Sequence, residues 1–285
     1  MVNTPVVIFL YKKLASVEII LNKLCKSAPS TVYIVMDGPE DLKTRERQNE
    51  IMEVISIFNF TVPFQIIRPK VHLGIRTIIQ FGLNKVFETE ERAIILEDDT
   101  LPSPLFFNFC EKMLNQFENE STVGCINGSN LGIEAGKQHY FMSKLSLPFW
   151  GWATWKNRWE QFPEKYDFWL KFRAQQSNHE IFEESTLAIF DRFVKKDKSW
   201  DVKWAMYLLA SSLRTVFPGE NLISNVGFTG EATFTNISNS SFSNLAAEES
   251  TFGEEDFKEE KQLEDKYLLK TKELIQEMAR RDTKL

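Results

Sequence analysis

The sequence has few residues of the kinds that build disulfide frameworks or transition-metal sites: three cysteines and three histidines among 285 residues. Cys25, Cys110 and Cys125 are too scattered for a disulfide framework or a CxxC metal site, which favours reduced, buried thiols and a cytoplasmic location. A basic excess is also missing, because the formal net charge is -6. This charge argues against nucleic acid as a partner.

Long apolar runs are absent too. No stretch approaches the roughly 18 uninterrupted apolar residues that span a bilayer, so we expect no transmembrane segment. The N-terminal apolar run has no basic region before it, which indicates a first strand rather than a signal peptide. No internal repeat is visible.

Aromatic residues, in contrast, are abundant: there are 24 phenylalanines and seven tryptophans. All seven tryptophans fall between positions 150 and 204, where random placement would scatter them. This region is therefore predicted to be either a dense core or a surface on which a ligand stacks. Core packing is the prediction for Trp155, Trp159 and Trp169.

The first hundred residues alternate between strand and helix patterns. Continuous β-branched and apolar runs predict buried strands over 6–10, 31–36, 64–67 and 93–96. Amphipathic segments predict helices over 44–58 and 74–87. A further helix is predicted after the first strand, with an apolar face made of Val17, Ile20, Leu21 and Leu24. This alternation predicts an α/β fold with a mostly parallel, Rossmann-like central sheet and helices on both faces.

Beyond position 102 the pattern is less regular. We expect helices over 102–117 and 202–213, strands over 123–126 and 214–217, and polar loops over 130–148 and 219–247. From position 248 the chain carries 12 acidic and 8 basic residues beside a thin apolar stripe that starts at Phe257, which predicts a charged C-terminal helix. The expected organisation is one domain over 1–247, with halves over about 1–101 and 102–247, and a helical tail over 248–285.

Three consecutive acidic residues, Glu97, Asp98 and Asp99, follow the fourth predicted strand, and Asp37 follows the second. Ligands of parallel sheets bind at the carboxyl ends of the strands, so both positions are candidate sites. Crowded carboxylates need a cation. Oxygen ligands suit Mg²⁺ or Mn²⁺ with a shell completed by substrate phosphates. A solvated acidic turn is the alternative.

Residues 94–107, IILEDDTLPSPLFF, resemble the metal-binding segment of GT-A fold glycosyltransferases. The likeness is to the N-acetylglucosaminyltransferase I type family and its bacterial relatives from surface-polysaccharide clusters. The segments VVIFLYKK, IVMDGPED and HLGIRTIIQFGLNKVF come before it in the expected order, and LPFWGWATWKNRW, WDVKWAMYLLASS and LISNVGFTGEATFT come after it. Each segment is weakly specific alone, but the ordered set covers roughly residues 5–236.

The resemblance implies transfer of a sugar from a nucleotide diphosphate donor, expected to be UDP-linked, to an acceptor hydroxyl. It places Mn²⁺ or Mg²⁺ on Asp99, the ribose or a metal-bound water near Asp98, and the donor sugar near Glu97. The remaining donor contacts that it implies are Asp37 with the uracil ring, Lys13 and Arg76 with the nucleotide, and Gly151 with Trp152 as a wall for the donor sugar. His72 is expected to be a bystander.

Direct displacement with inversion is the expected mechanism. A divalent metal stabilises the diphosphate leaving group, and a carboxylate takes the proton of the acceptor hydroxyl. Asp201, in the segment SWDVKW, matches the family's base. An Asp before an amphipathic run is also a good helix N-cap, so both roles stay open. Many relatives carry a late histidine where this chain has Phe234, which would leave the metal more dependent on Asp99.

Two other functions remain open. A sugar-nucleotide nucleotidyltransferase usually has a glycine-rich basic loop after its first strand. This chain has YKKLASVE at that position, without a glycine, which counts against this function. A non-catalytic or degenerate carbohydrate- or nucleotide-binding protein is disfavoured by the intact Asp37, Asp99 and Asp201, and mildly favoured by Phe234.

The partners expected for a transferase are a UDP-sugar and a glycan or lipid-linked glycan acceptor, in bacterial surface glycan synthesis. Such an acceptor would bring a cytoplasmic enzyme to the periphery of the inner membrane. The C-terminal helix is expected to pack on the body of the chain or, in a homo-oligomer, on a second copy.

Overall fold

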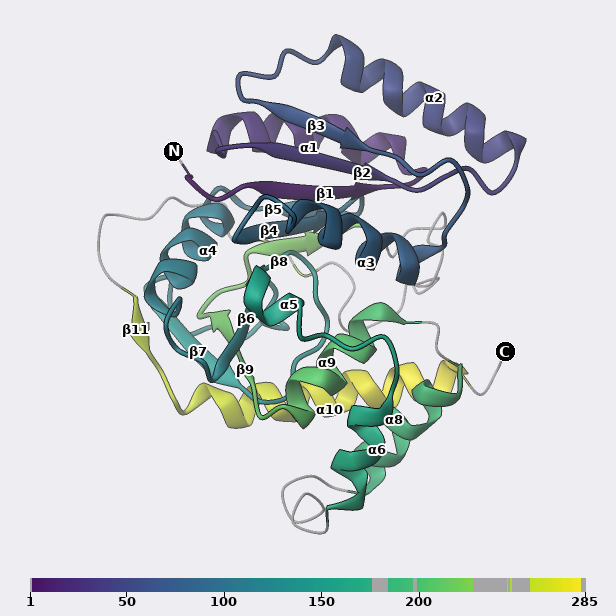
Figure 1. Ribbon diagram of the computed structural model, residues 1–285. Coiled ribbons are helices and arrows are strands. Elements are labelled where there is room, and N and C mark those ends of the chain that lie inside the picture. The colour runs from purple at the N-terminus through teal and green to yellow at the C-terminus, as the bar shows by residue number, and fades with distance from the viewer. Residues whose placement is uncertain are drawn as a thin grey trace.

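The computed structural model describes residues 2–175, 184–196, 199–227, 245, 247 and 257–282. The first half alternates strand and helix as the sequence predicts (Figure 1). Its elements are β1 (Val6–Leu10), α1 (Leu14–Ser27), β2 (Val32–Met36), α2 (Leu42–Ile57), β3 (Phe64–Ile67), α3 (Ile75–Val86) and β4 (Arg92–Glu97). These four strands run parallel in the order β4-β1-β2-β3.

The second half mixes strand directions. Its elements are β5 (Thr100–Pro102), α4 (Pro104–Gln116), β6 (Val123–Asn127), β7 (His139–Ser143), β8 (Trp152–Trp155), α5 (Lys156–Trp159), α6 (Asp167–Ala174), α8 (Glu184–Lys196), α9 (Trp200–Ala210), β9 (Arg214–Pro218), β10 (Ile223–Asn225), β11 (Lys258–Glu259) and α10 (Leu263–Asp282). Within the described residues, nine strands form one sheet in the order β11-β7-β9-β6-β8-β4-β1-β2-β3. β5 and β10 form a separate antiparallel pair.

Most neighbours in the large sheet are parallel. β8 is antiparallel to both β4 and β6, and β7 is antiparallel to β9, whereas the other pairs are parallel. The predicted α/β fold with a mostly parallel, Rossmann-like sheet is therefore confirmed. β7 lies within 130–148, where the sequence predicts a loop; its pairing with β9 is a long-range contact that the local pattern does not reveal.

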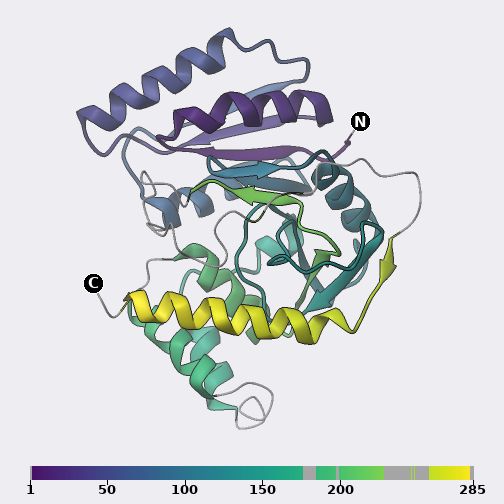
Figure 2. The same ribbon diagram turned by 180° about the vertical axis from the view of Figure 1, so that it is seen from behind.

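The strand residues explain why helices cover both faces of the sheet. In β1, Val7 and Phe9 pack into one apolar core, while Val6, Ile8 and Leu10 pack into the other. Because side chains alternate along a strand, a continuous apolar run is buried on both sides. The helices α1, α2 and α4 supply one core, and α3, α6, α8, α9 and α10 supply the other (Figures 1 and 2).

The charged tail forms α10, which packs on the body of its own chain against α8 and β7 (Figure 2). Tyr267 and Ile275 are buried in this contact, and the Tyr267 hydroxyl donates a 2.9 Å hydrogen bond to the carbonyl of Leu147. Phe257, the first member of the predicted stripe, is not helical; its ring packs edge-on against Phe109. The apolar face that the sequence offers to a second copy is thus covered by the chain itself.

The helices of the described part of the chain do not include one long and apolar enough to cross a membrane.

Candidate active site

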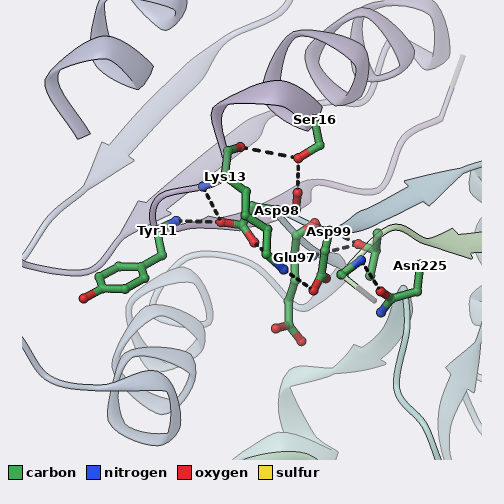
Figure 3. A network of polar contacts seen from close by, with 9 residues as sticks. Tyr11, Lys13, Ser16, Glu97, Asp98, Asp99 and Asn225 are labelled. Atoms are coloured by element: carbon green, nitrogen blue, oxygen red, sulfur yellow. Dashed lines mark hydrogen bonds and ion pairs between the residues drawn. The ribbon is translucent and has the colours of Figure 1, made fainter. Parts of the chain in front are cut away.

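The carboxyl ends of β1, β2 and β4 lie at one edge of the sheet because these strands are parallel. β4 ends at Glu97, and Asp98 and Asp99 form the turn into β5 (Figure 3). The Thr100 hydroxyl closes the turn: it accepts a hydrogen bond from the Glu97 amide and donates one to the Glu97 carbonyl, both 2.9 Å long. Figure 3 shows the Glu97 side chain pointing away from those of Asp98 and Asp99, so the three carboxylates do not face the same point.

Asp98 fastens the loop that follows β1. Its Oδ2 accepts hydrogen bonds from the amides of Tyr11 (3.1 Å) and Lys13 (3.4 Å), and its carbonyl accepts one from the Ser16 hydroxyl. Burial raises the pKa of Asp98 to about 6, and the charge of Asp99 adds to this shift. Asp98 therefore directs its carboxylate to the protein's own backbone and positions Lys13 at the start of α1.

Lys13 forms an ion pair with Asp99. Its Nζ lies 2.6 Å from Asp99 Oδ2 and 3.8 Å from Asp98 Oδ1. The side chains of Lys13 and Asp99 are 18% and 19% exposed, so the pair lies at the surface of the site rather than in the core. Burial acts to lower the pKa of Lys13, but Asp99 and Asp98 outweigh it and the pKa is raised. Lys13 is therefore a cation that faces the acidic turn.

Asp201 contributes a fourth carboxylate to this region. Burial raises the pKa of Glu97 well above its usual range, and the charges of Asp99 and Asp201 raise it further. Asp201 must therefore lie near enough to act on Glu97, although the two are far apart in the sequence. The residue predicted as the base therefore interacts electrostatically with the acidic turn predicted as the donor site.

The position of Asp201 in α9 separates its two predicted roles. The N-cap residue of α9 is Ser199, so the N-cap interpretation of Asp201 is wrong. Asp201 lies in the first helical turn, where its carboxylate accepts hydrogen bonds from the Val202 amide (2.9 Å) and the Ser199 hydroxyl. Burial raises the pKa of Asp201. A carboxylate with a raised pKa binds a proton more readily, which suits a general base.

Asp37, at the end of β2, fastens the turn before α3. Its Oδ1 accepts hydrogen bonds from the backbone amides of Gly38 (2.8 Å) and Leu73 (2.9 Å), and its Oδ2 accepts one from the amide of Gly74 (2.9 Å). His72 Nδ1 lies 2.8 Å from the same Oδ2, and the Asp37 side chain is only 4% exposed. Direct contact with a uracil ring, as predicted, would require these bonds to break. In this structure Asp37 shapes the loop instead.

His72, expected as a bystander, joins the site through Tyr11. The two rings stack with centroids 5.5 Å apart and planes 29° from parallel. Because the Tyr11 amide is bonded to Asp98, this pair links the turn held by Asp37 to the acidic turn. Arg76 lies in the first turn of α3, directly after the same loop. Sequence reasoning missed Tyr11; only its place immediately after β1 could have indicated it.

The segment 225–227 lies against Asp99, and sequence reasoning did not identify it as part of the site. The Val226 amide, just after β10, donates a 2.9 Å hydrogen bond to the Asp99 carbonyl. A Cβ atom added to Gly227 would lie 2.3 Å from Asp99 Oδ2, so a glycine is what lets the chain pass here. Asn225 Oδ1 accepts the Gly227 amide at 2.7 Å. Phe234, in the continuation of this segment, lies outside the described residues, so its effect stays a prediction.

Trp152 does not lie at this edge. It belongs to β8, opposite Ile95 of β4, and only 1% of it is exposed. Four aromatic rings surround it with centroids 5.5 to 6.0 Å away: Phe149, Trp159, Trp200 and Trp204. The ring has no open face for a sugar, so the prediction of Trp152 as a sugar wall is wrong. A buried indole on a central strand packs in the core instead.

Gly151 also has a structural explanation. Its φ of 63° lies in the left-handed region that favours glycine. A Cβ atom there would lie 2.4 Å from Cδ1 of Ile223. The prediction of core positions for Trp155, Trp159 and Trp169 is confirmed, because these are 4%, 3% and 0% exposed. The tryptophan-rich segment is therefore mainly a core.

Metal binding has limited support from the geometry. In the part of the chain that the structure describes, no group of three or more His, Cys, Asp or Glu side chains could hold a metal ion. Mg²⁺ sites commonly need only one or two protein carboxylates, with water and substrate phosphates as the other ligands. Asp99 is partly exposed and already pairs with a cation, so it fits such a site as a single ligand, provided that Lys13 moves away.

The comparisons with known proteins find similar solved structures but no similar family model or curated sequence. No family model matches the chain, and no curated protein matches it. Among solved structures, a UDP-glucose pyrophosphorylase complexed with UDP-glucose is similar with a TM-score of 0.38 and 9% sequence identity. The alignment covers 77% of this chain and 91% of that chain. Values this low assign neither a substrate nor an activity to this chain.

Proposed function

We propose that this protein is a metal-dependent, inverting glycosyltransferase that takes a sugar from a nucleotide diphosphate donor, expected to be a UDP-sugar. One observation carries the proposal: at the carboxyl end of β4, the partly exposed carboxylate of Asp99 forms a 2.6 Å ion pair with Lys13, beside Asp98. A metal-ligand candidate and a cation for phosphate thus lie at the sheet edge where parallel α/β folds bind ligands, and the charge of Asp201, the proposed base, acts on Glu97 of the same turn. The order of the sequence segments that resemble GT-A transferases gives independent support.

The proposed roles follow from charge. Asp99 would hold Mn²⁺ or Mg²⁺, which when bound supplies Lewis-acid stabilisation of the diphosphate leaving group. Lys13 contributes a positive charge to the same diphosphate, and Arg76 at the start of α3 contributes another. Asp201 takes the proton of the acceptor hydroxyl as the bond to the sugar forms. Attack from the side opposite the leaving diphosphate inverts the configuration at the anomeric carbon.

The other predicted residues take indirect roles. Asp98 holds the loop that carries Lys13, and Asp37 holds the loop that precedes Arg76. The stacked pair of Tyr11 and His72 joins these two loops, and we propose that its rings contact the nucleobase. The acceptor is proposed to be a glycan or lipid-linked glycan hydroxyl.

Calorimetry with UDP tests the proposal. UDP should bind more tightly with Mn²⁺ than without metal, and Asp99→Ala should abolish this difference. Glu88→Ala is a matched control, because Glu88 forms a surface ion pair with Lys85 far from any predicted ligand. UDP binding that is indifferent to metal in the wild-type protein would contradict the metal assignment.

The product distinguishes the remaining alternatives. Incubation of a UDP-sugar with a panel of acceptors should release UDP and not UTP. Formation of UTP from a UDP-sugar and pyrophosphate would indicate a nucleotidyltransferase instead. Mn²⁺-dependent binding of UDP without any turnover on lipid-linked or free glycans would favour a non-catalytic binding protein.

A further inference from the structure

Asp99 is the proposed metal ligand, yet the structure gives its carboxylate another cation. Lys13 Nζ lies 2.6 Å from Asp99 Oδ2 and 3.8 Å from Asp98 Oδ1, so the ammonium sits between two carboxylates (Figure 3). A divalent ion held by Asp99 would compete with this ammonium for the same carboxylate. Two cations cannot share one carboxylate oxygen at contact distance without strong repulsion. The Lys13–Asp99 pair therefore opposes the binding of a metal ion to Asp99.

We propose that Lys13 is a displaceable counter-ion that couples metal binding to nucleotide binding. In one state Lys13 neutralises Asp99 and competes with metal. In the other, Lys13 turns to the diphosphate of the donor, and Asp99 becomes free to bind Mn²⁺ or Mg²⁺. This inference rests on the proposed function, and it adds how the site is regulated: the diphosphate is the trigger that opens the metal site.

The local structure allows this exchange at the side chain alone. The Lys13 backbone is fixed, because its amide is bonded to Asp98 and Lys13 is the N-cap residue of α1. The Lys13 side chain is 18% exposed, and a lysine is a point charge on a flexible stem. The ammonium can therefore move towards a phosphate while the loop stays in place.

The electrostatics explain why a diphosphate is needed. If Lys13 left without replacement, Asp99 would lose the cation that lies 2.6 Å from it while Asp98 and Glu97 stay beside it, which is unfavourable for crowded carboxylates. A metal ion on Asp99 restores that balance, and a diphosphate gives the ammonium a new anionic partner. Each ligand thus removes the obstacle to the other, which is positive coupling between two sites.

Binding of Mn²⁺ measured by electron paramagnetic resonance of the free ion tests the proposal without any measurement of catalysis. The full-length protein is titrated with Mn²⁺, without nucleotide and with UDP. The variants are Lys13→Met, which removes the counter-ion, and Lys26→Met, which makes the same change at the other end of α1. Lys26 is exposed in the last turn of that helix, so it provides a matched control.

The expected signature is a pair of opposite effects. Without nucleotide, Lys13→Met should bind Mn²⁺ about tenfold more tightly than the wild type, within the usual range of coupling between sites. With Mn²⁺ present, the same variant should bind UDP more weakly, because the ammonium no longer reaches the diphosphate. Lys26→Met should change neither affinity. A lysine with a purely structural role would not produce an increase in Mn²⁺ affinity.

Several outcomes would overturn the inference. Mn²⁺ affinity without nucleotide that is unchanged or lower in Lys13→Met overturns the counter-ion role, and the proposed function survives if UDP still enhances Mn²⁺ binding. Wild-type protein that binds no Mn²⁺ with or without UDP contradicts both. If thermal unfolding shows that Lys13→Met does not fold, Lys13→Arg decides: it keeps the charge, and Mn²⁺ binding tighter than in the wild type would overturn the proposal.

Discussion

Two regions of the molecule share the strand β4 and differ in almost every other respect. At Ile95 the strand pairs with Trp152, in an interior of packed aromatic rings. Two residues further on, Glu97 begins a turn where carboxylates crowd around a partly exposed lysine. The aromatic side chains are stabilised by burial within the chain, because their rings exclude water and contact one another. The acidic region is left with excess negative charge, which a ligand can relieve.

This difference shows which kind of unusual composition marks a site. The tryptophan cluster is the more conspicuous feature of the sequence, yet Trp152, Trp169 and Trp204 are among the largest fully buried side chains. The acidic triplet is short and common, yet two of its carboxylates, Glu97 and Asp98, have raised pKa values because of burial and the negative charges of their neighbours. Ionisable groups with strongly perturbed pKa values cluster at functional sites, whereas buried aromatic rings are the ordinary content of a core.

The largest expected effect concerns Asp201, at the acidic edge. Asp201→Asn should lower kcat by about 10²–10⁴-fold, the usual contribution of a general base, because an amide cannot accept the proton. UDP affinity should stay within about twofold, because the base acts on the acceptor. Steady-state kinetics with the identified acceptor and calorimetry with UDP measure both quantities.

Asp167→Asn is the control for Asp201→Asn, because Asp167 is also an acidic residue in the first turn of a helix but is exposed on α6. It should leave kcat unchanged. Activity retained in Asp201→Asn would place the base elsewhere. Equal losses in both variants would show that the effect is one of helix stability.

The next effect concerns the aromatic interior. Trp152→Ala should lower the free energy of unfolding by about 3–5 kcal/mol, because it removes a large buried ring and leaves a cavity. Leu170→Ala, at a residue that is 62% exposed, should change it by less than about 0.5 kcal/mol. Chemical denaturation measures both. A folded Trp152→Ala variant of unchanged stability that had lost only UDP-sugar binding would restore Trp152 as part of the donor site.

The fold of the first half could be predicted from the sequence because its strands and helices depend on local patterns. The run Val6–Leu10 is apolar at every position, and α1 buries Val17, Ile20, Leu21 and Leu24 as its periodicity predicts. The tryptophan segment could not be placed in this way. Trp152 is in a strand only because β8 enters the sheet between β4 and β6, and this pairing joins residues that are distant in the sequence.

The acidic residues of the candidate site could be predicted from the sequence, whereas the residues that contact them could not. Glu97, Asp98 and Asp99 follow a recognisable strand, so their place at the sheet edge follows from topology. Nothing local indicates that Asp98 is turned towards the backbone of Tyr11, since this depends on the packing of β1 beside β4. The approach of Gly227 to Asp99 likewise depends on the pairing of β10 with β5.

A smaller effect should separate the two interpretations of Asp37. Asp37→Asn replaces one acceptor oxygen by an NH₂ group that faces backbone amides, so the free energy of unfolding should fall by about 2 kcal/mol. Asp41→Asn is the control: Asp41 is the N-cap of α2, and Asn caps a helix about as well as Asp. If Asp37→Asn weakened UDP binding and left stability unchanged, Asp37 would contact the nucleotide directly.

The smallest effect concerns the glycine that borders the acidic turn. Gly227→Ala would crowd Asp99 Oδ2, whereas Gly124→Ala would crowd Leu208 in the core at a similar distance, 2.4 Å. Both should lose some stability, but only Gly227→Ala displaces the proposed metal ligand. In the presence of Mn²⁺, its binding free energy for UDP should weaken by about 1 kcal/mol, which is the lower end of the usual cost of overpacking. This corresponds to a roughly fivefold higher dissociation constant. Equal UDP affinities in the two variants would mean that Asp99 can shift without loss, and the acidic edge would then be as tolerant of crowding as the aromatic interior.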